Sequence, residues 1–118
     1  MSSISVANGN NVYDSRDNCN AVIEKATDRL MLGCKNTTIP NNVKIIGSRS
    51  FYNCTELTNI TIPNGVTSIE DDAFAYCSGL TSIQIPSSVT VMGTEVFSHC
   101  SNLESFSWPE SLTIINKA

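Results

Sequence analysis

VTSIEDDAFAYCSGLTSIQIPSS, residues 66–88, decides the fold of this chain because the sequence repeats it on both sides. VKIIGSRSFYNCTELTNITIPNG (43–65) precedes it, and VTVMGTEVFSHCSNLESFSWPES (89–111) follows it with the same residue types in register. A fourth copy begins at Leu112. A period of about 20 to 30 residues is typical of a solenoid, in which each unit is one coil stacked on the previous one. The sequence therefore predicts an α/β solenoid with a 23-residue coil.

Each copy contains the same short apolar segments. An L-x-x-I-x-I spacing comes first, and its last two members alternate with polar residues, as in a strand with one buried face. A proline ends this strand because it has no amide hydrogen to donate. A V-x-x-I pair follows, and then a good helix N-cap at Ser48, Asp71 or Thr94. The next residues include Phe and Cys three positions apart, which favours a short helix with one face inward. We expect parallel strands in register, with Phe51, Phe74 and Phe97 lined up along a shared axis.

The first 42 residues depart from the period but carry traces of it. CKNTTIPNNV, residues 34–43, matches the strand part of an earlier coil. Two short apolar runs around a polar turn precede it, which predicts an antiparallel β-hairpin. We expect residues 1–42 to form a partial repeat with a hairpin insert that caps the array. The remaining chain, residues 43–118, then holds three full repeats (43–65, 66–88 and 89–111) and a partial fourth.

The register of this hairpin decides whether two cysteines can meet. With a turn near residues 25–28, Ala21 and Ile23 face Leu32 and Leu30, and Cys19 lies opposite Cys34. That register would allow a disulfide between Cys19 and Cys34. A slip of the turn would instead pair Cys34 with Ala21, and both registers stay open at this point.

The other three cysteines occupy equal positions in the full repeats. Stacked coils would place Cys54, Cys77 and Cys100 in a line about 5 Å apart. A metal site needs several thiolates that converge on one point, and in-register neighbours have unsuitable directions for a disulfide. We therefore expect buried free thiols, no metal and no cofactor.

No group of residues has the spacing of a catalytic site. His99 is the only histidine, and its neighbour Cys100 diverges from it on a turn, so a surface histidine is expected. The acidic cluster at residues 70–72 is explained better by carboxylates at a helix start than by a Ca²⁺ site. We expect a protein that is not an enzyme.

Composition excludes further classes of function. The chain has 118 residues, enough for one domain, and a formal net charge of −4, which argues against nucleic-acid binding. No window is apolar enough to span a membrane. The first ten residues lack the basic and apolar parts of a signal peptide, and we expect any targeting segment to lie outside this sequence.

The pattern L-x-x-I-x-I-P-x-x-V-x-x-I-x-x-x-A-F-x-x-C resembles the BspA-type leucine-rich repeat of bacterial surface proteins. The resemblance implies a right-handed coil with a concave parallel sheet and short helices on the other face. It also implies a non-enzymatic, adhesion-like binding module that is secreted or on the cell surface, with a host or matrix protein or a glycan as partner. A structural spacer or assembly module without a ligand of its own is the alternative.

The outward strand positions are the candidate partner-binding residues on the concave face. They form two polar, uncharged rows: Asn36, Asn59, Ser82 and Ser105 in one, and Thr38, Thr61, Gln84 and Ser107 in the other. Solenoids commonly bind partners on such a continuous sheet. Both chain ends interrupt a coil, so we also expect end-to-end self-association through unpaired strand edges.

Overall fold

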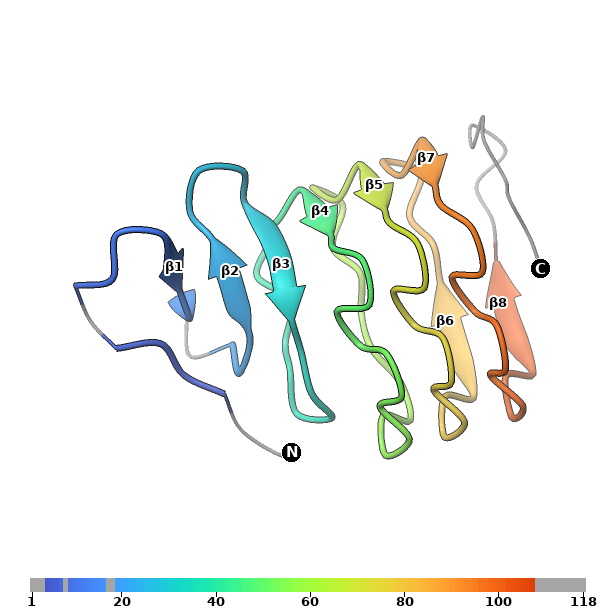
Figure 1. The fold of residues 1–118 in the computed structure, drawn as a ribbon. Coiled ribbons are helices and arrows are strands. Elements are labelled where there is room, and N and C mark those ends of the chain that lie inside the picture. Colours follow the sequence, from blue (N-terminus) through green and yellow to red (C-terminus); the bar gives the residue numbers. More distant parts are fainter. Residues whose placement is uncertain (1–3, 8, 17–18, 108–118) are drawn as a thin grey trace.

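The computed structural model describes residues 4–7, 9–16 and 19–107, which form a row of stacked coils that begins with a hairpin (Figure 1). Within these residues the strands are short: β1 (Tyr13–Asp14), β2 (Val22–Glu24), β3 (Arg29–Leu32), β4 (Ile45–Ile46), β5 (Ser68–Ile69), β6 (Ser82–Gln84), β7 (Val91–Met92) and β8 (Ser105–Ser107). No helix in this part of the chain is long and apolar enough to cross a membrane.

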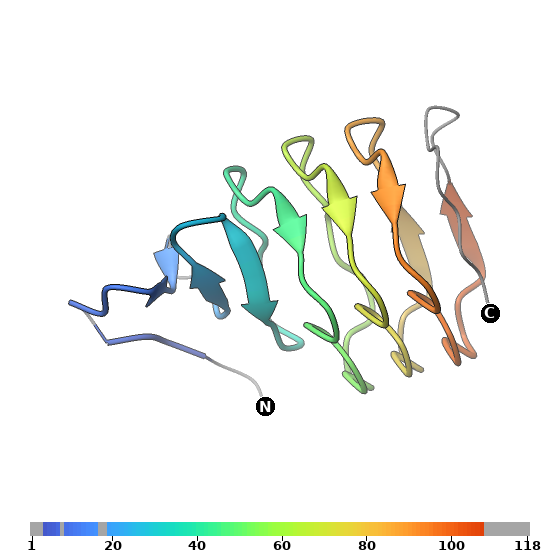
Figure 2. The ribbon, with the colours of Figure 1, turned by 45° about the horizontal axis from the view of Figure 1, so that its top comes forward.

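The strands form two sheets on different sides of the coils. One has the order β1-β2-β3-β4-β5-β7, and the other consists of β6 and β8 (Figure 2). From β3 onward every pairing is parallel, and Ile45 lies opposite Ser68, which lies opposite Val91. These partners follow the 23-residue step of the sequence, as do Ser82 and Ser105. The prediction of parallel, in-register strands is therefore confirmed. The sheet with more strands comes, however, from the V-x-x-I pairs, while the L-x-x-I-x-I segments pair regularly only at β6 and β8.

The expectation of a short helix in each coil is wrong for the described coils, where consecutive turns follow Ser48, Asp71 and Thr94. Alternate amides in these turns point in different directions. Ala73, Ala75 and Cys77 donate to carbonyls three residues earlier, whereas Asp72, Phe74 and Tyr76 donate to Thr94, Val96 and Ser98 of the next coil. A helix would use all of these amides internally. The left-handed backbone of Asp72 and Tyr76, with φ of 58° and 62°, interrupts helical geometry and turns every second amide toward the neighbouring coil.

The hairpin insert is present, with a register that differs from both expected ones. Ile23 lies opposite Leu30 as predicted, but a bulge follows and places Val22 opposite Leu32. Because a bulge adds one residue to one strand, the sequence beyond it shifts relative to its partner. Cys34 Sγ then lies 3.6 Å from the carbonyl oxygen of Asn20, and Cys19 and Cys34 are both buried free thiols. The disulfide that one of the two registers would allow is not formed in this structure, and the pairing of Cys19 with Cys34 stays a hypothesis.

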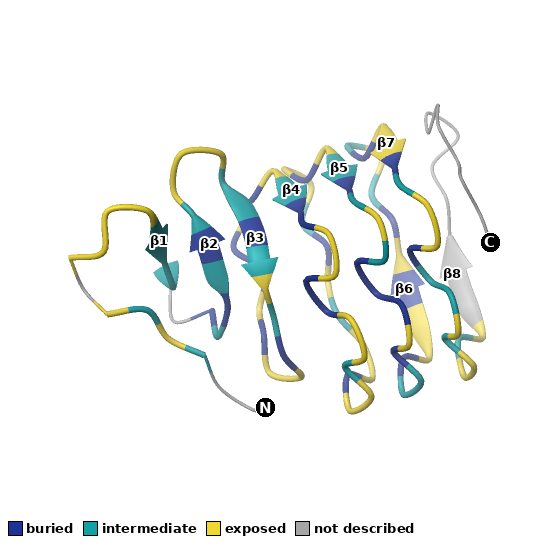
Figure 3. Cartoon of the chain, in the orientation of Figure 1, coloured by how far each residue is buried: buried dark blue, intermediate teal, exposed yellow. Residues whose placement is uncertain are grey.

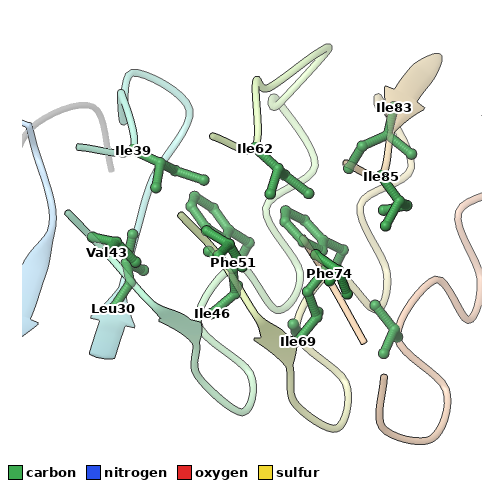
Figure 4. Close-up of a cluster of buried hydrophobic side chains, with 14 of the residues drawn as sticks. Leu30, Ile39, Val43, Ile46, Phe51, Ile62, Ile69, Phe74, Ile83 and Ile85 are labelled. Carbon is green, nitrogen blue, oxygen red and sulfur yellow. The ribbon is translucent and has the colours of Figure 1, made fainter. Parts of the chain in front are cut away.

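A column of stacked phenylalanines runs through the interior, and Figure 4 shows two of its rings, Phe51 and Phe74. The ring centroids of Phe51 and Phe74 are 5.0 Å apart, and those of Phe74 and Phe97 are 5.6 Å apart, with nearly parallel planes. Phe51 and Phe74 are at most 1% exposed. Equivalent aliphatic residues form parallel columns beside the rings: Val43, Val66 and Val89; Ile46 and Ile69; Leu57 and Leu80. The expected alignment of the three phenylalanines is confirmed, and the core extends along the row of coils.

The cysteines of the full repeats form a second column beside the rings. Cys77 is buried, Cys54 and Cys100 are half-buried, and all three are free. Cys77 Sγ lies 3.0 Å from the carbonyl oxygen of Phe51, and Cys100 Sγ lies 3.0 Å from that of Phe74, so each thiol can donate to the preceding coil. Burial disfavours the thiolate and raises the pKa of Cys54 and Cys100, and it raises the pKa of Cys77 to about 12.

We predict that Phe74→Ala lowers the free energy of unfolding by about 3–5 kcal/mol, because it leaves a cavity between two rings as well as removing apolar burial. Urea denaturation followed by circular dichroism measures this change. The exposed Thr58→Ala is the matched control and should change stability by no more than about 0.5 kcal/mol. A loss below about 1 kcal/mol for Phe74→Ala would contradict the coil-to-coil core.

Cys77 also predicts a pH dependence of stability. Because its folded-state pKa lies above its ordinary value of 9.0, the neutral thiol is favoured in the folded protein. This preference contributes to the free energy of unfolding. The contribution is fully present below about pH 9 and is lost as the pH rises toward 12. Urea denaturation under reducing conditions should therefore show a decline of about 1–2 kcal/mol between pH 8.5 and 10.5 that is attributable to this thiol. Cys77→Ala should show a shallower decline, and equal slopes in the two proteins would refute the assignment.

Candidate interaction surfaces

The two predicted polar rows lie on one outer side of the coils. Six of their side chains fall within the described residues, and all are exposed: Asn36, Thr38, Asn59, Thr61, Ser82 and Gln84. We call these six residues the polar strand face. The backbones of Ser105 and Ser107 continue the rows in β8, opposite Ser82 and Gln84, while their side chains lie outside the described part of the structure. The role of these positions in partner binding stays a prediction.

Backbone pairing and strand alternation hold the polar strand face in place. Ile83 in β6 is buried between exposed Ser82 and Gln84, and Figure 3 shows this alternation along β6. The Thr81 amide donates to the Thr58 carbonyl at 3.1 Å, and the Glu104 amide donates to the Thr81 carbonyl at 3.0 Å. Because apolar side chains pack on the inner side of each coil, the backbone positions from which the outer side chains project are fixed. This surface is therefore rigid in its backbone and uncharged along its rows.

One ion pair lies next to this surface. Lys35 Nζ is 3.0 Å from Glu56 Oε1, and the two residues belong to successive coils. The hydrogen bond from Lys35 lowers the pKa of the Glu56 carboxyl. Since Glu56 is exposed, solvent screens the pair, which contributes little to stability.

The acidic cluster at residues 70–72 connects coils and does not begin a helix as expected. Arg29 Nε and the Ser48 amide both donate to Glu70 Oε1, at 2.8 and 3.1 Å. Asp71 Oδ1 accepts the Thr94 amide at 2.8 Å, and Asp72 Oδ2 lies 3.7 Å from Arg49 Nε. The three carboxylates thus have partners in three different segments. Within the described residues, no group of three or more His, Cys, Asp or Glu side chains has the arrangement of a metal site.

The turns carry a surface of another kind, which the sequence analysis missed. Tyr52, Tyr76 and His99 form a row in which the Tyr52 and Tyr76 centroids are 5.4 Å apart and those of Tyr76 and His99 are 4.5 Å apart. Arg49 places its guanidinium carbon 5.1 Å from the Tyr52 ring centroid. We call these four residues the aromatic turn strip. Tyr52 and Tyr76 are each 42% exposed, and His99 is exposed as predicted.

The repeat alignment hid this strip. Tyr52 aligns with Ala75 and not with Tyr76, so the two tyrosines occupy different slots of the 23-residue pattern. The left-handed residues were the missing signal, because Arg49, Tyr76 and Glu95 belong to types that rarely adopt this conformation, unlike Asn53, Asp72 and His99.

A shallow hollow near the hairpin is lined by residues that include Tyr13, Asp14, Arg16 and Lys25. Arg16 forms two ion pairs there. Its Nε lies 2.9 Å from Asp14 Oδ1, and its Nη1 lies 2.7 Å from Asp28 Oδ1. The hydrogen bond from Arg16 lowers the pKa of Asp14. An arginine with two carboxylate partners stabilises the hairpin and is poorly placed to bind a further anion.

Comparison with known proteins agrees with this arrangement of coils. The sequence model of the BspA type leucine rich repeat region (6 copies) matches residues 30–118. A leucine-rich repeat protein from Eubacterium ventriosum superposes with a TM-score of 0.81 and 27% identity, over 93% of this chain and 31% of that one. The pneumococcal vaccine antigen PcpA superposes with a TM-score of 0.65 and 19% identity, over 93% of this chain and 34% of that one, which shows a shared fold.

The chain thus spans about a third of the length of these two solved proteins. A search of curated protein sequences gave no match. Proteins of the matched family are generally binding or repeat modules without enzymatic activity. Since the family pattern covers most of the sequence and the structure has the corresponding mostly parallel coils, this chain belongs to the BspA-type leucine-rich repeat family.

Proposed function

We propose that this chain is a non-enzymatic adhesion module of a bacterial cell-surface or secreted protein, and that the polar strand face binds its partner. The family supports an interaction module, and a vaccine antigen among its structural neighbours is consistent with surface exposure. The observation that carries the proposal is the set of six exposed polar side chains in two rows on a hydrogen-bonded backbone. The candidate partners are host or matrix proteins and glycans.

The chemistry of the polar strand face favours a particular mode of contact. Its hydroxyl and amide groups donate and accept hydrogen bonds, and their small size lets a partner's backbone or sugar hydroxyls approach closely. Because the rows lack aromatic and arginine side chains, each coil contributes little binding energy. Affinity must then come from many coils acting together on one extended partner. The chains of the two solved neighbours are about three times as long as this one, and an array of that length could supply such an area.

The rival function is a structural spacer or assembly module, in which the polar rows only keep the array soluble. A spacer requires rigidity and solubility but no particular pattern on either outer side. A ligand surface, in contrast, requires that the outward side chains at Thr61 and Gln84 remain accessible to the partner. The two functions therefore differ in their tolerance of bulky charged residues at these positions.

We predict that the double variant Thr61→Arg/Gln84→Arg loses partner binding by at least about tenfold while its melting temperature stays within a few degrees of the parent. The partner is first selected by a binding screen of the parent chain against immobilised matrix proteins and glycans, and affinity is then measured by surface plasmon resonance. Val91→Arg is the matched control, because Val91 is an exposed strand residue of the other sheet. Unchanged binding in the double variant, or no partner in the screen, would favour the spacer.

A further inference from the structure

The aromatic turn strip places bulky side chains where the backbone does not favour them. Asn53, Tyr76 and His99 occupy equal positions in successive coils, with φ of 59°, 62° and 59°. Asparagine and histidine are enriched in this left-handed conformation, whereas most larger side chains adopt it at a cost of about 1–2 kcal/mol. The cost at Tyr76 is offset in part by its stacking on His99. Side chains kept at unfavourable exposed positions are a reason to look for a function.

The strip is held ready for contact. The Tyr76 amide donates to the Ser98 carbonyl at 2.8 Å, and the Asn53 amide donates to the Ala75 carbonyl at the same distance. The Tyr76 backbone is thus held by a hydrogen bond to the next coil, and its ring is held between those of Tyr52 and His99. A side chain that is already ordered loses little entropy on binding. Tyrosine also combines a large apolar ring with a hydroxyl group, and tyrosine and arginine are frequent hot-spot residues in protein interfaces.

The charges around the strip indicate which partner fits. Arg49, Asp72 and Glu95 form a second column of left-handed residues, with φ of 57°, 58° and 55°. Together with the exposed Asp71, this column carries three carboxylates and one guanidinium, and the whole chain has a net charge of −4. Such a surface attracts a cationic segment and repels an acidic one. Residues 49–99 therefore combine aromatic rings with excess negative charge.

The chain already shows how a cation binds here. The Arg49 guanidinium lies over the Tyr52 ring at 5.1 Å and 3.7 Å from the Asp72 carboxylate. Both contacts are of the kind that arginine makes across protein interfaces. Glu95 repeats the Asp72 position one coil further on, next to the coil turn that carries His99. Arg49 already contacts Tyr52 and Asp72, so a cation from a partner would meet the exposed Tyr76 ring, one residue past the slot of Tyr52, and the exposed Glu95 carboxylate.

We propose that the aromatic turn strip, with Asp72 and Glu95, binds an arginine- or lysine-containing segment of a partner polypeptide. Guanidinium or ammonium groups of the segment contact the exposed parts of the tyrosine rings and pair with the carboxylates. This surface consists of turn residues, whereas the polar strand face consists of strand residues. Binding by the aromatic turn strip can therefore be tested separately from binding by the polar strand face.

The repeat itself supplies the variants for the test. Tyr76→Asn and His99→Asn introduce the residue that the first full repeat has at the same position, Asn53, so both remove a ring while easing the backbone conformation. The probe is a fluorescein-labelled peptide with four arginines separated by Gly-Ser, with lysine and glutamate versions of equal length. Fluorescence anisotropy at low and at physiological salt measures binding. Gln84→Ala, on the polar strand face, is the matched control.

We expect the arginine peptide to bind most tightly, the glutamate peptide least, and the affinity to fall as salt rises. Tyr76→Asn should weaken binding of the arginine peptide by about tenfold or more, as loss of a hot-spot tyrosine does, with an unchanged or higher melting temperature. Glu95→Gln should weaken it several-fold at low salt. Gln84→Ala should leave it unchanged.

Several results would overturn the proposal. They are the absence of arginine-peptide binding at millimolar concentration, equal or tighter binding of the glutamate peptide, and full binding by Tyr76→Asn. Loss of binding in Gln84→Ala would assign the peptide to the polar strand face instead. If Tyr76→Asn fails to fold, Tyr52→Ser decides the question in its place, because Tyr52 is not among the left-handed residues. Unchanged binding in that folded variant would also count against the strip.

Discussion

Each coil of this protein depends on contact between its buried side chains and the same side chains of the next coil. Phe74 shows this dependence, because its ring is covered on one side by Phe51 and on the other by Phe97. A single coil of 23 residues could bury none of these rings by itself, and it gains a core only when a neighbour supplies the other half. The constraint acts on position, since a ring that is displaced along the chain by one residue would leave the column. This requirement explains why the sequence keeps its spacing even where residue types vary, as at Ser50, Ala73 and Val96.

The backbone also connects neighbouring coils, through two sets of hydrogen bonds whose donor-to-acceptor directions are opposite along the array. In the larger sheet, later coils donate to earlier ones, as Glu70 does to the Ile46 carbonyl. In the turns, earlier coils donate to later ones, as Phe51 does to the Ala73 carbonyl. Two neighbouring coils are therefore connected on two sides by ladders of opposite polarity, with the phenylalanine column between them. Relative sliding or tilting of one coil would break bonds on both sides, so the outward side chains are displayed from a stiff frame.

The sequence was sufficient for whatever depends on equal spacing. The parallel register of β4, β5 and β7, the alignment of the phenylalanines and the free thiols of Cys54, Cys77 and Cys100 all follow from superposing identical slots. Features that depend on local backbone choice were not accessible in this way. The turns were mistaken for helices because Phe and Cys three residues apart suit both structures, and the bulge beside Val22 has no sequence signature. The polar strand face was predictable from alternation, whereas the aromatic turn strip joins slots of unequal position, Tyr52 and Tyr76.

The separation of inner from outer positions determines where a new function can arise in such an array. Inner slots are tied to their neighbours on both sides, so a change at one coil affects the packing of three. Outer positions on the strands are not fixed by packing in the core, and those on the turns are restricted mainly by the left-handed backbone. Asn53, Tyr76 and His99 share that backbone yet differ completely in chemistry, which shows that side-chain identity there is free of the core. Because stacking couples Tyr76 to His99 across coils, a substitution at one coil creates a surface that extends over its neighbour. A repeat fold can thus acquire a contiguous binding strip through single changes, without any alteration of its interior.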